Sequence, residues 1–127
     1  MINNFLIINC IGKNDKIGLK VNGEFFIHDF DSKTKNNELI VITILNLIKN
    51  YKINFNKDFS VLINSGPGSF SSMRVSLAIA KGIKISKNIN LYGFKNSDLG
   101  QFNLANIDLL INKNLLQKNL IKPLYIS

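Results

Sequence analysis

The alternation of apolar and polar positions in the first third of the chain predicts three β-strands. Residues 5–11 form a short, mostly apolar run rich in isoleucine that ends in a turn sequence, which is typical of a buried strand. Residues 17–21 alternate, and the pair Asn22 and Gly23 is a strong signal for a two-residue hairpin turn. Residues 24–30 continue as a strand, so we expect a three-stranded meander.

Residues 37–50 carry the pattern of a helix. No glycine or proline interrupts them, and Thr34 or Asn36 could cap a helix that begins here. Their apolar side chains cover more than half of the helical circumference, whereas a surface helix usually carries a single apolar stripe. We therefore expect burial on two sides, one against the sheet and the other against a second helix or a partner.

The middle of the chain predicts parallel crossovers. A strand over residues 59–64, a helix over residues 72–85 that Ser71 or Ser72 could cap, and a strand over residues 90–94 follow one another. This order after a meander indicates an α/β fold with a mixed sheet of about five strands and packed helices.

The last quarter gives weaker patterns. We expect one or two helical turns over residues 96–102, a short strand over residues 107–111, and a helix over residues 113–120 that ends before Pro123.

Length and composition limit the class of protein. A chain of 127 residues suits one domain. The apolar run at its start is short and interrupted by polar residues, which does not fit a targeting or membrane-spanning segment, so we expect a cytoplasmic protein. Cys10 and His28 are the only cysteine and histidine, which excludes the common zinc sites. A Cys/His nucleophile pair is formally possible, but we interpret Cys10 as a buried strand residue.

The formal charge of +8 raises the possibility of nucleic-acid binding. Fifteen of the sixteen basic residues are lysine, however, and asparagine and isoleucine occur twenty times each. This joint enrichment is what an AT-rich coding bias produces, whereas arginine and aromatic side chains carry most base and phosphate recognition. Composition alone leaves open whether the charge contacts nucleic acid.

Residues 65–82 hold the most informative motif. Gly66, Pro67 and Gly68 predict a tight turn from a strand into a helix. The turn lacks the lysine of a P-loop and the third glycine of a dinucleotide fingerprint, so by itself it favours a structural role over phosphate binding.

As a string, the motif resembles the signature of the TsaB (YeaZ) family, in which Gly-Pro-Gly-Ser-Phe is followed by an arginine and a helix of small residues that ends in Ala-Lys-Gly. The end of the chain, Pro123 to Ile126, is also similar to the family's closing Pro-x-Tyr-Leu. The resemblance covers residues 1 to about 100 and these last few. The signature positions kept here are Gly66, Pro67, Gly68, Ser69, Phe70, Arg74, Leu77, Ala78, Ala80, Lys81 and Gly82.

The resemblance implies a single lobe of the actin-like ATPase (ribonuclease-H-like) fold. We expect residues 1–127 to form the family's N-terminal lobe, with residues 104–127 a short remnant of the second lobe and the tail. The sequence has Asn9 where the family has aspartate, and an amide lacks the anionic oxygen that Mg²⁺ favours. We therefore expect no catalytic residue, no metal site and no cofactor.

The resemblance further implies a non-catalytic scaffold that pairs with TsaD in the complex forming N6-threonylcarbamoyladenosine at position 37 of tRNA. TsaE would join the larger complex, tRNA would be contacted only indirectly, and the chain would form a homodimer when TsaD is absent. The alternative is a nucleotide-dependent kinase or hydrolase lobe of the same superfamily, which the scattered positions of the eight acidic residues disfavour.

Two helical faces are the predicted partner interface. On the first helix either Val41, Leu45 and Ile48 or Ile40, Ile44 and Leu47 face outward, and on the second a row of small residues would allow close approach. The full predicted set is Ile40, Val41, Ile44, Leu45, Ile48, Ser72, Met73, Ser76 and Ala80.

Overall fold

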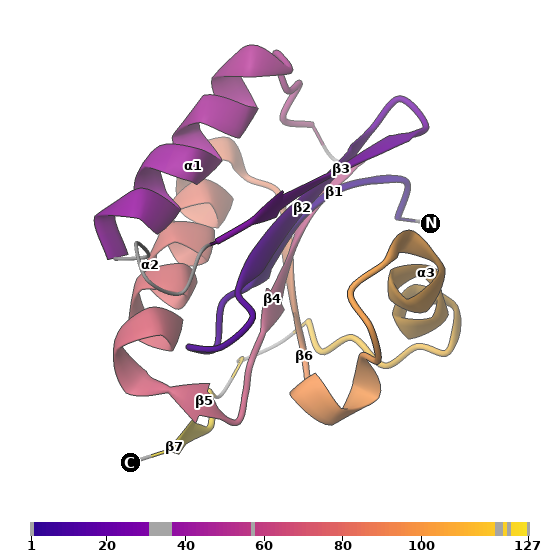
Figure 1. Cartoon of the computed structure of the whole chain (residues 1–127). Coiled ribbons are helices and arrows are strands. Elements are labelled where there is room, and N and C mark those ends of the chain that lie inside the picture. The colour runs from indigo at the N-terminus through magenta and orange to yellow at the C-terminus, as the bar shows by residue number, and fades with distance from the viewer. Residues whose placement is uncertain (1, 31–36, 57, 119–120, 122, 127) are drawn as a thin grey trace.

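The computed structural model describes residues 2–30, 37–56, 58–118, 121 and 123–126. They form a five-stranded mixed sheet in the order β3-β2-β1-β4-β6, and Figure 1 shows helices on both of its faces. β1 (Asn4–Asn9), β2 (Lys16–Val21) and β3 (Glu24–Asp29) form an antiparallel meander, while β4 (Phe59–Asn64) and β6 (Asn90–Phe94) extend the sheet in parallel with β1. The predicted meander and the mixed five-stranded sheet are both confirmed.

Two long helices make the parallel crossovers on one face of the sheet. α1 (Asn37–Asn50) joins β3 to β4 over the predicted range, and α2 (Phe70–Lys87) joins β4 to β6. α2 begins earlier than predicted. Ser69 occupies its N-cap position, and the side chain of Ser69 makes no capping hydrogen bond. The prediction that Ser71 or Ser72 caps this helix is therefore wrong, and the predicted caps of α1, Thr34 and Asn36, lie outside the described residues.

The segment after β6 agrees with the prediction only in part, since a helical turn is present within residues 96–102 but no strand follows it. A short 3₁₀ helix, η1 (Asn96–Asp98), is followed by α3 (Leu104–Asn112), so the predicted strand over residues 107–111 is wrong. Asn103 caps α3, because its side chain accepts a hydrogen bond of 2.8 Å from the backbone N–H of Asn106.

The chain after α3 is extended where we predicted a helix. Residues 115–118 are not helical, and Gln117 pairs with Gly93 through two backbone hydrogen bonds of 2.8 Å. A small second sheet joins β5 (Gly68–Ser69) to β7 (Tyr125–Ile126) in parallel. The predicted helix over residues 113–120 is wrong over its described part because this segment instead pairs with the edge of the sheet.

The core has two halves, one on each face of the sheet. Leu6 and Ile8 of β1 face α1 and α2, while Phe5 and Ile7 face α3. All six residues of β4 are buried, which explains why this strand reads as an apolar run rather than as an alternating pattern. Among the described helices, none has the length and apolar content needed to cross a bilayer.

Candidate functional site

The signature turn lies where three separate segments of the chain meet. The N–H of Leu124 donates to the carbonyl of Ser65 at 2.8 Å, and the N–H of Gly68 donates back to the carbonyl of Leu124 at 3.0 Å. The N–H of Ser69 donates to the carbonyl of Ile11 at 2.7 Å. Backbone groups of the turn are therefore engaged by the loop after β1 and by the chain's last strand, as in a structural junction.

Gly66 and Gly68 are needed at this turn for different reasons. Gly66 has a φ of +97°, which residues with a side chain rarely adopt, and a Cβ there would lie 2.4 Å from the carbonyl oxygen of Leu124. At Gly68 the limit is space, because a Cβ would lie 2.5 Å from the Cβ of Ile11 and 2.9 Å from the sulfur of Met73. The turn thus depends on close approach, of backbone to backbone at Gly66 and of side chains to backbone at Gly68.

Three asparagines lie together at the carboxyl ends of neighbouring parallel strands. The amide nitrogen of Asn64, at the end of β4, donates to Oδ1 of Asn9 at 2.6 Å and to Oδ1 of Asn96 at 3.0 Å. Asn64 Oδ1 accepts from the backbone N–H of Gly66 at 2.8 Å. This asparagine cluster (Asn9, Asn64 and Asn96) connects β1, β4 and β6 through neutral amides.

The position of the cluster is one where open α/β sheets commonly bind ligands. An open, mostly polar groove of about 600 Å³ lies beside it, between the loop after β1 and the segment that leads into α3. Lys13 and Lys16 line the groove, and Lys16 is paired with Asp29 across β2 and β3. The described residues contain no group of three or more histidine, cysteine or acidic side chains able to hold a metal ion.

Sequence reasoning identified Asn9 but missed Asn64 and Asn96. Each of the three residues stands at or just after the end of a parallel strand, and only the strand order reveals that they meet. The available signal was that the carboxyl ends of adjacent parallel strands share one edge of the sheet.

Phe70 and Arg74 of the signature form an exposed aromatic cluster at the start of α2. The guanidinium carbon of Arg74 lies 5.8 Å from the centroid of the Phe70 ring, and Tyr125 of β7 meets that ring edge-on at 4.8 Å. The side chain of Phe70 is 52% exposed. The only arginine of the chain therefore packs over a surface aromatic ring.

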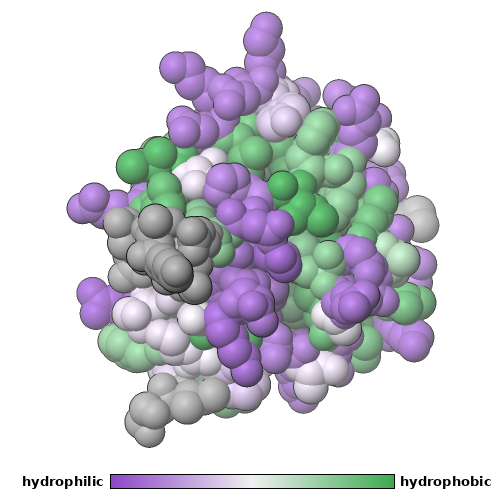
Figure 2. Space-filling model, viewed as in Figure 1, coloured by the Kyte–Doolittle hydropathy of each residue, from purple (hydrophilic) through white to green (hydrophobic). Residues whose placement is uncertain are grey.

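The outward arc of α1 is decided by the structure. Ile40 and Ile44 are buried in the core. Leu47 and Ile48 both pack against it, so Leu45, with Val41 half-buried beside it, is the part of the other arc that faces away from the sheet. Leu45 is 59% exposed and its neighbour Ile42 is 51% exposed. Figure 2 shows hydrophobic side chains at the surface between hydrophilic ones on this view of the molecule.

On α2 the structure turns the predicted small residues inward. Ser72, Met73, Ser76 and Ala80 are at most 4% exposed, because this side of α2 packs against β4 and α1. The hydroxyl of Ser76 donates to the carbonyl of Ser72 at 2.9 Å within the helix. A second row of small residues, Ala78 and Gly82, is exposed instead.

This placement divides the predicted interface set. Ile40, Ile44, Ser72, Met73, Ser76 and Ala80 are covered by the chain itself, whereas Val41 and Ile48 are half-buried and Leu45 is exposed. We call the surface formed by Val41, Ile42, Leu45, Ala78 and Gly82 the outer helical face.

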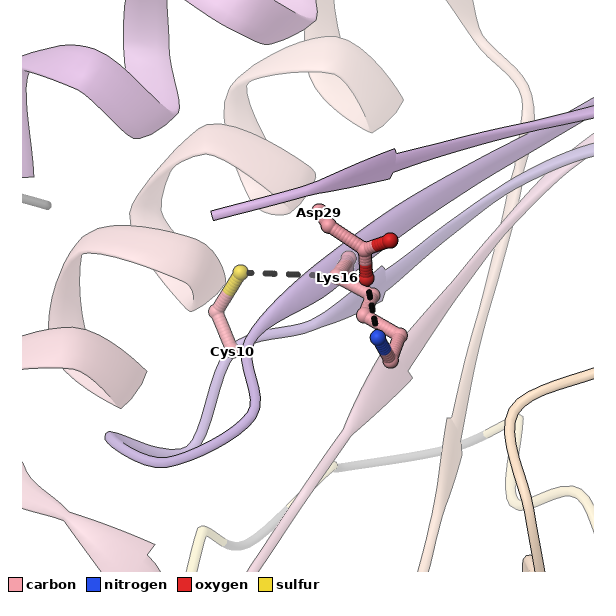
Figure 3. A network of polar contacts seen from close by, with 3 residues as sticks. All are labelled: Cys10, Lys16 and Asp29. Carbon is pink, nitrogen blue, oxygen red and sulfur yellow. Dashed lines mark hydrogen bonds and ion pairs between the residues drawn. The ribbon is translucent and has the colours of Figure 1, made fainter. Parts of the chain in front are cut away.

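Cys10 has the surroundings of a core residue. Its side chain is 1% exposed, and its sulfur lies 3.9 Å from the carbonyl oxygen of Lys16, in the network that Figure 3 shows together with Asp29. His28 packs edge-on against Phe30, with 4.9 Å between ring centroids. The thiol of Cys10 is thus directed at a backbone carbonyl inside the fold.

Comparison with known proteins locates this fold among solved structures. No family model matches the sequence, and no curated protein matches it. YeaZ from Pseudomonas aeruginosa superimposes with a TM-score of 0.64 at 12% identity over 74% of this chain and 44% of that chain. A second structure, described as an uncharacterized protein similar to peptidase YeaZ from Pseudomonas aeruginosa, gives 0.63 at 12% identity with the same coverage.

These matches define the fold and its extent. The described chain has the fold of the matched part of YeaZ, in agreement with the resemblance of the signature, and it spans less than half the length of those proteins.

Proposed function

We propose that this protein is a non-catalytic scaffold of the TsaB (YeaZ) kind, built as one actin-like lobe. It pairs with a TsaD homologue in the complex that forms N6-threonylcarbamoyladenosine at position 37 of tRNA. The fold shared with YeaZ and the signature from Gly66 to Arg74 support this assignment. The observation that carries the pairing is the outer helical face.

The outer helical face has the composition of a helix-to-helix contact. Two large aliphatic side chains of α1, Ile42 and Leu45, are more than half exposed. Ala78 and Gly82 make the outside of α2 narrow, and a Cβ at Gly82 would meet no atom within 4 Å. Small residues on one helix let a partner helix approach closely, while exposed apolar side chains on its neighbour supply the area to bury.

The same face serves self-association when the partner is absent. A face that is apolar and narrow can pair with a second copy of itself about a twofold axis. We therefore propose a homodimer for the isolated chain and a heterodimer with TsaD. TsaE joins the larger complex, and tRNA contacts this subunit only indirectly.

The asparagine cluster supports a role without catalysis. Amides at the ends of β1, β4 and β6 supply neither a general base nor an anionic ligand for Mg²⁺. Asn64 is 2% exposed and uses its amide to join three strands. The chemistry of the complex is accordingly assigned to TsaD.

Co-purification with the TsaD homologue of the same organism tests the pairing. Leu45→Glu places a charge at the centre of the outer helical face and should weaken capture by tenfold or more, which is about 1.4 kcal/mol. Asn46→Glu adds the same charge to the exposed neighbouring position and should leave capture unchanged. Equal capture of both variants, or no capture of the unmodified chain, contradicts the proposal.

The alternative is a nucleotide-dependent kinase or hydrolase lobe, and one observation favours it. The polar groove beside the asparagine cluster contains Lys13 and Lys16, which could meet phosphates. A nucleotide enzyme would bind ATP with an affinity that falls in Lys13→Ala, whereas the scaffold role requires no such dependence.

A further inference from the structure

A second concave surface lies between α2 and the edge of the sheet. It has a volume of about 270 Å³ and is lined by Lys81, Lys84 and Ile85 of α2, Leu91 of β6, and Lys118 and Ile121. We call it the lysine-rimmed groove. It lies on the β6 side of α2, apart from the apolar arc of α1.

The floor of the groove is apolar and firmly placed. Leu91 is 3% exposed and Ile121 is 8% exposed. Ile121 packs so closely over Gly93 that a Cβ there would lie 2.9 Å from its Cγ2. The paired backbone hydrogen bonds between Gly93 and Gln117 hold the chain at Gln117 against β6, the edge strand of the sheet.

Ile85 stands at the mouth of the groove almost free of protein contact. Its side chain is 82% exposed, more than any other large apolar side chain in the described part of the chain. A single exposed aliphatic residue is ordinary, but this one borders a hollow whose floor is also aliphatic. The two together make a site able to enclose one large apolar side chain.

The rim of the groove has only positive charge. Lys81, Lys84 and Lys118 are exposed, and within the described residues no ion pair joins any of them to an acid. In the sequence, the stretches 59–97 and 109–127, within which all the lining residues fall, contain no aspartate or glutamate. The ligand that complements this rim carries carboxylates or other anions.

We propose that the lysine-rimmed groove binds an acidic segment of a partner protein, which inserts one aliphatic or aromatic side chain between carboxylates. The aliphatic floor favours a protein over single-stranded nucleic acid, whose bases stack on aromatic or guanidinium planes that this groove lacks. Lysine ammonium groups on flexible stems suit carboxylates at several positions. The groove adjoins the outer helical face, because Lys81 and Ile85 lie three residues from Ala78 and Gly82 on α2, but its proposal does not rest on pairing through that face.

Fluorescence anisotropy with a labelled peptide of alternating glutamate and leucine tests the groove. We expect saturable binding to the unmodified chain, weakened tenfold or more by Ile85→Ser and by Lys84→Glu. Both positions are exposed, so the fold should be kept, and unchanged unfolding curves will verify this. Lys113→Glu changes an exposed lysine outside the groove and is the matched control, with binding expected to stay the same.

Several results would overturn the proposal. One is absence of peptide binding, and another is equal binding by Ile85→Ser. Equal binding of an all-glutamate peptide would mean that charge alone acts. Preferential binding of a labelled single-stranded oligonucleotide or of vesicles with anionic lipids, lost in Lys84→Glu, would assign the groove to nucleic acid or to a membrane instead.

Discussion

Gly68 lets the turn after β4 lie against the loop after β1. Any side chain there would meet Ile11 and Met73, because an added Cβ would lie 2.5 Å from the Cβ of Ile11 and 2.9 Å from the sulfur of Met73. We expect Gly68→Ala to lower the free energy of unfolding by about 1–3 kcal/mol through overpacking, and Gly68→Val by at least as much. Urea unfolding followed by circular dichroism measures the loss.

Gly82→Ala is the control for this residue. A Cβ at Gly82 meets nothing within 4 Å, and alanine favours the helix by about 0.8–1 kcal/mol. The two glycine variants should therefore change stability in opposite directions at a concentration where the chain is monomeric. An unchanged midpoint in Gly68→Ala with lost partner binding would instead identify the turn as a binding loop.

Asn64 is the residue on which the ends of three strands depend. Its amide donates to Asn9 and Asn96 and accepts from Gly66, and Asn64 itself is only 2% exposed. Asn64→Ala leaves the buried N–H of Gly66 and the half-buried amides of Asn9 and Asn96 without this partner, so we expect a loss of about 1–3 kcal/mol in thermal or urea unfolding. Asn46→Ala, at an exposed position of α1, should stay within about 0.5 kcal/mol of the unmodified chain. Equal stability of the two variants would mean that the cluster has no structural role.

At the scale of the element, α2 carries two rows of small residues with different roles. The row with Ser76 is buried and lets the helix approach β4 and α1, while the row with Ala78 faces outward. We expect Ser76→Phe to destabilise the fold by about 1–3 kcal/mol or more, because the added ring has no space. Thermal unfolding should show a lower midpoint for this variant.

Ala78→Phe adds the same ring to the exposed row of α2. We expect it to keep the unfolding midpoint and to weaken self-association, which sedimentation velocity measures. A stable Ser76→Phe would show that α2 can move away from the sheet, and normal self-association of Ala78→Phe would place the contact on another surface.

At the scale of the whole molecule, one lobe with an amide cluster is not expected to turn over nucleotide. The isolated chain should release no phosphate from ATP above a matched blank and should transfer no threonylcarbamoyl group. Phosphate release that disappears in Lys13→Ala would contradict the proposed scaffold role and favour the nucleotide-dependent alternative.

The sequence by itself determined the elements whose pattern is local. The hairpin at Asn22 and Gly23, the helix over residues 37–50 and the buried strand over residues 59–64 are all confirmed. Turn chemistry specifies the hairpin and the uninterrupted apolar pattern specifies the helix, while the strand over residues 59–64 is indicated by its short length and the turn residues that follow it. The signature turn was also predicted as a structural turn, because its lack of phosphate-binding features is visible in the sequence.

Tertiary structure decided the features that the local sequence pattern leaves undetermined. The apolar run around Ile107 is too short to separate strand from helix by period, and capping by Asn103 with burial against the far face of the sheet made it helical. The two arcs of α1 are similarly hydrophobic, so only packing on the sheet selected Ile40 and Ile44 for the core. Likewise the asparagine cluster and the lysine-rimmed groove join segments distant in sequence. Only the strand order and the pairing of Gln117 with Gly93 of β6 bring them together.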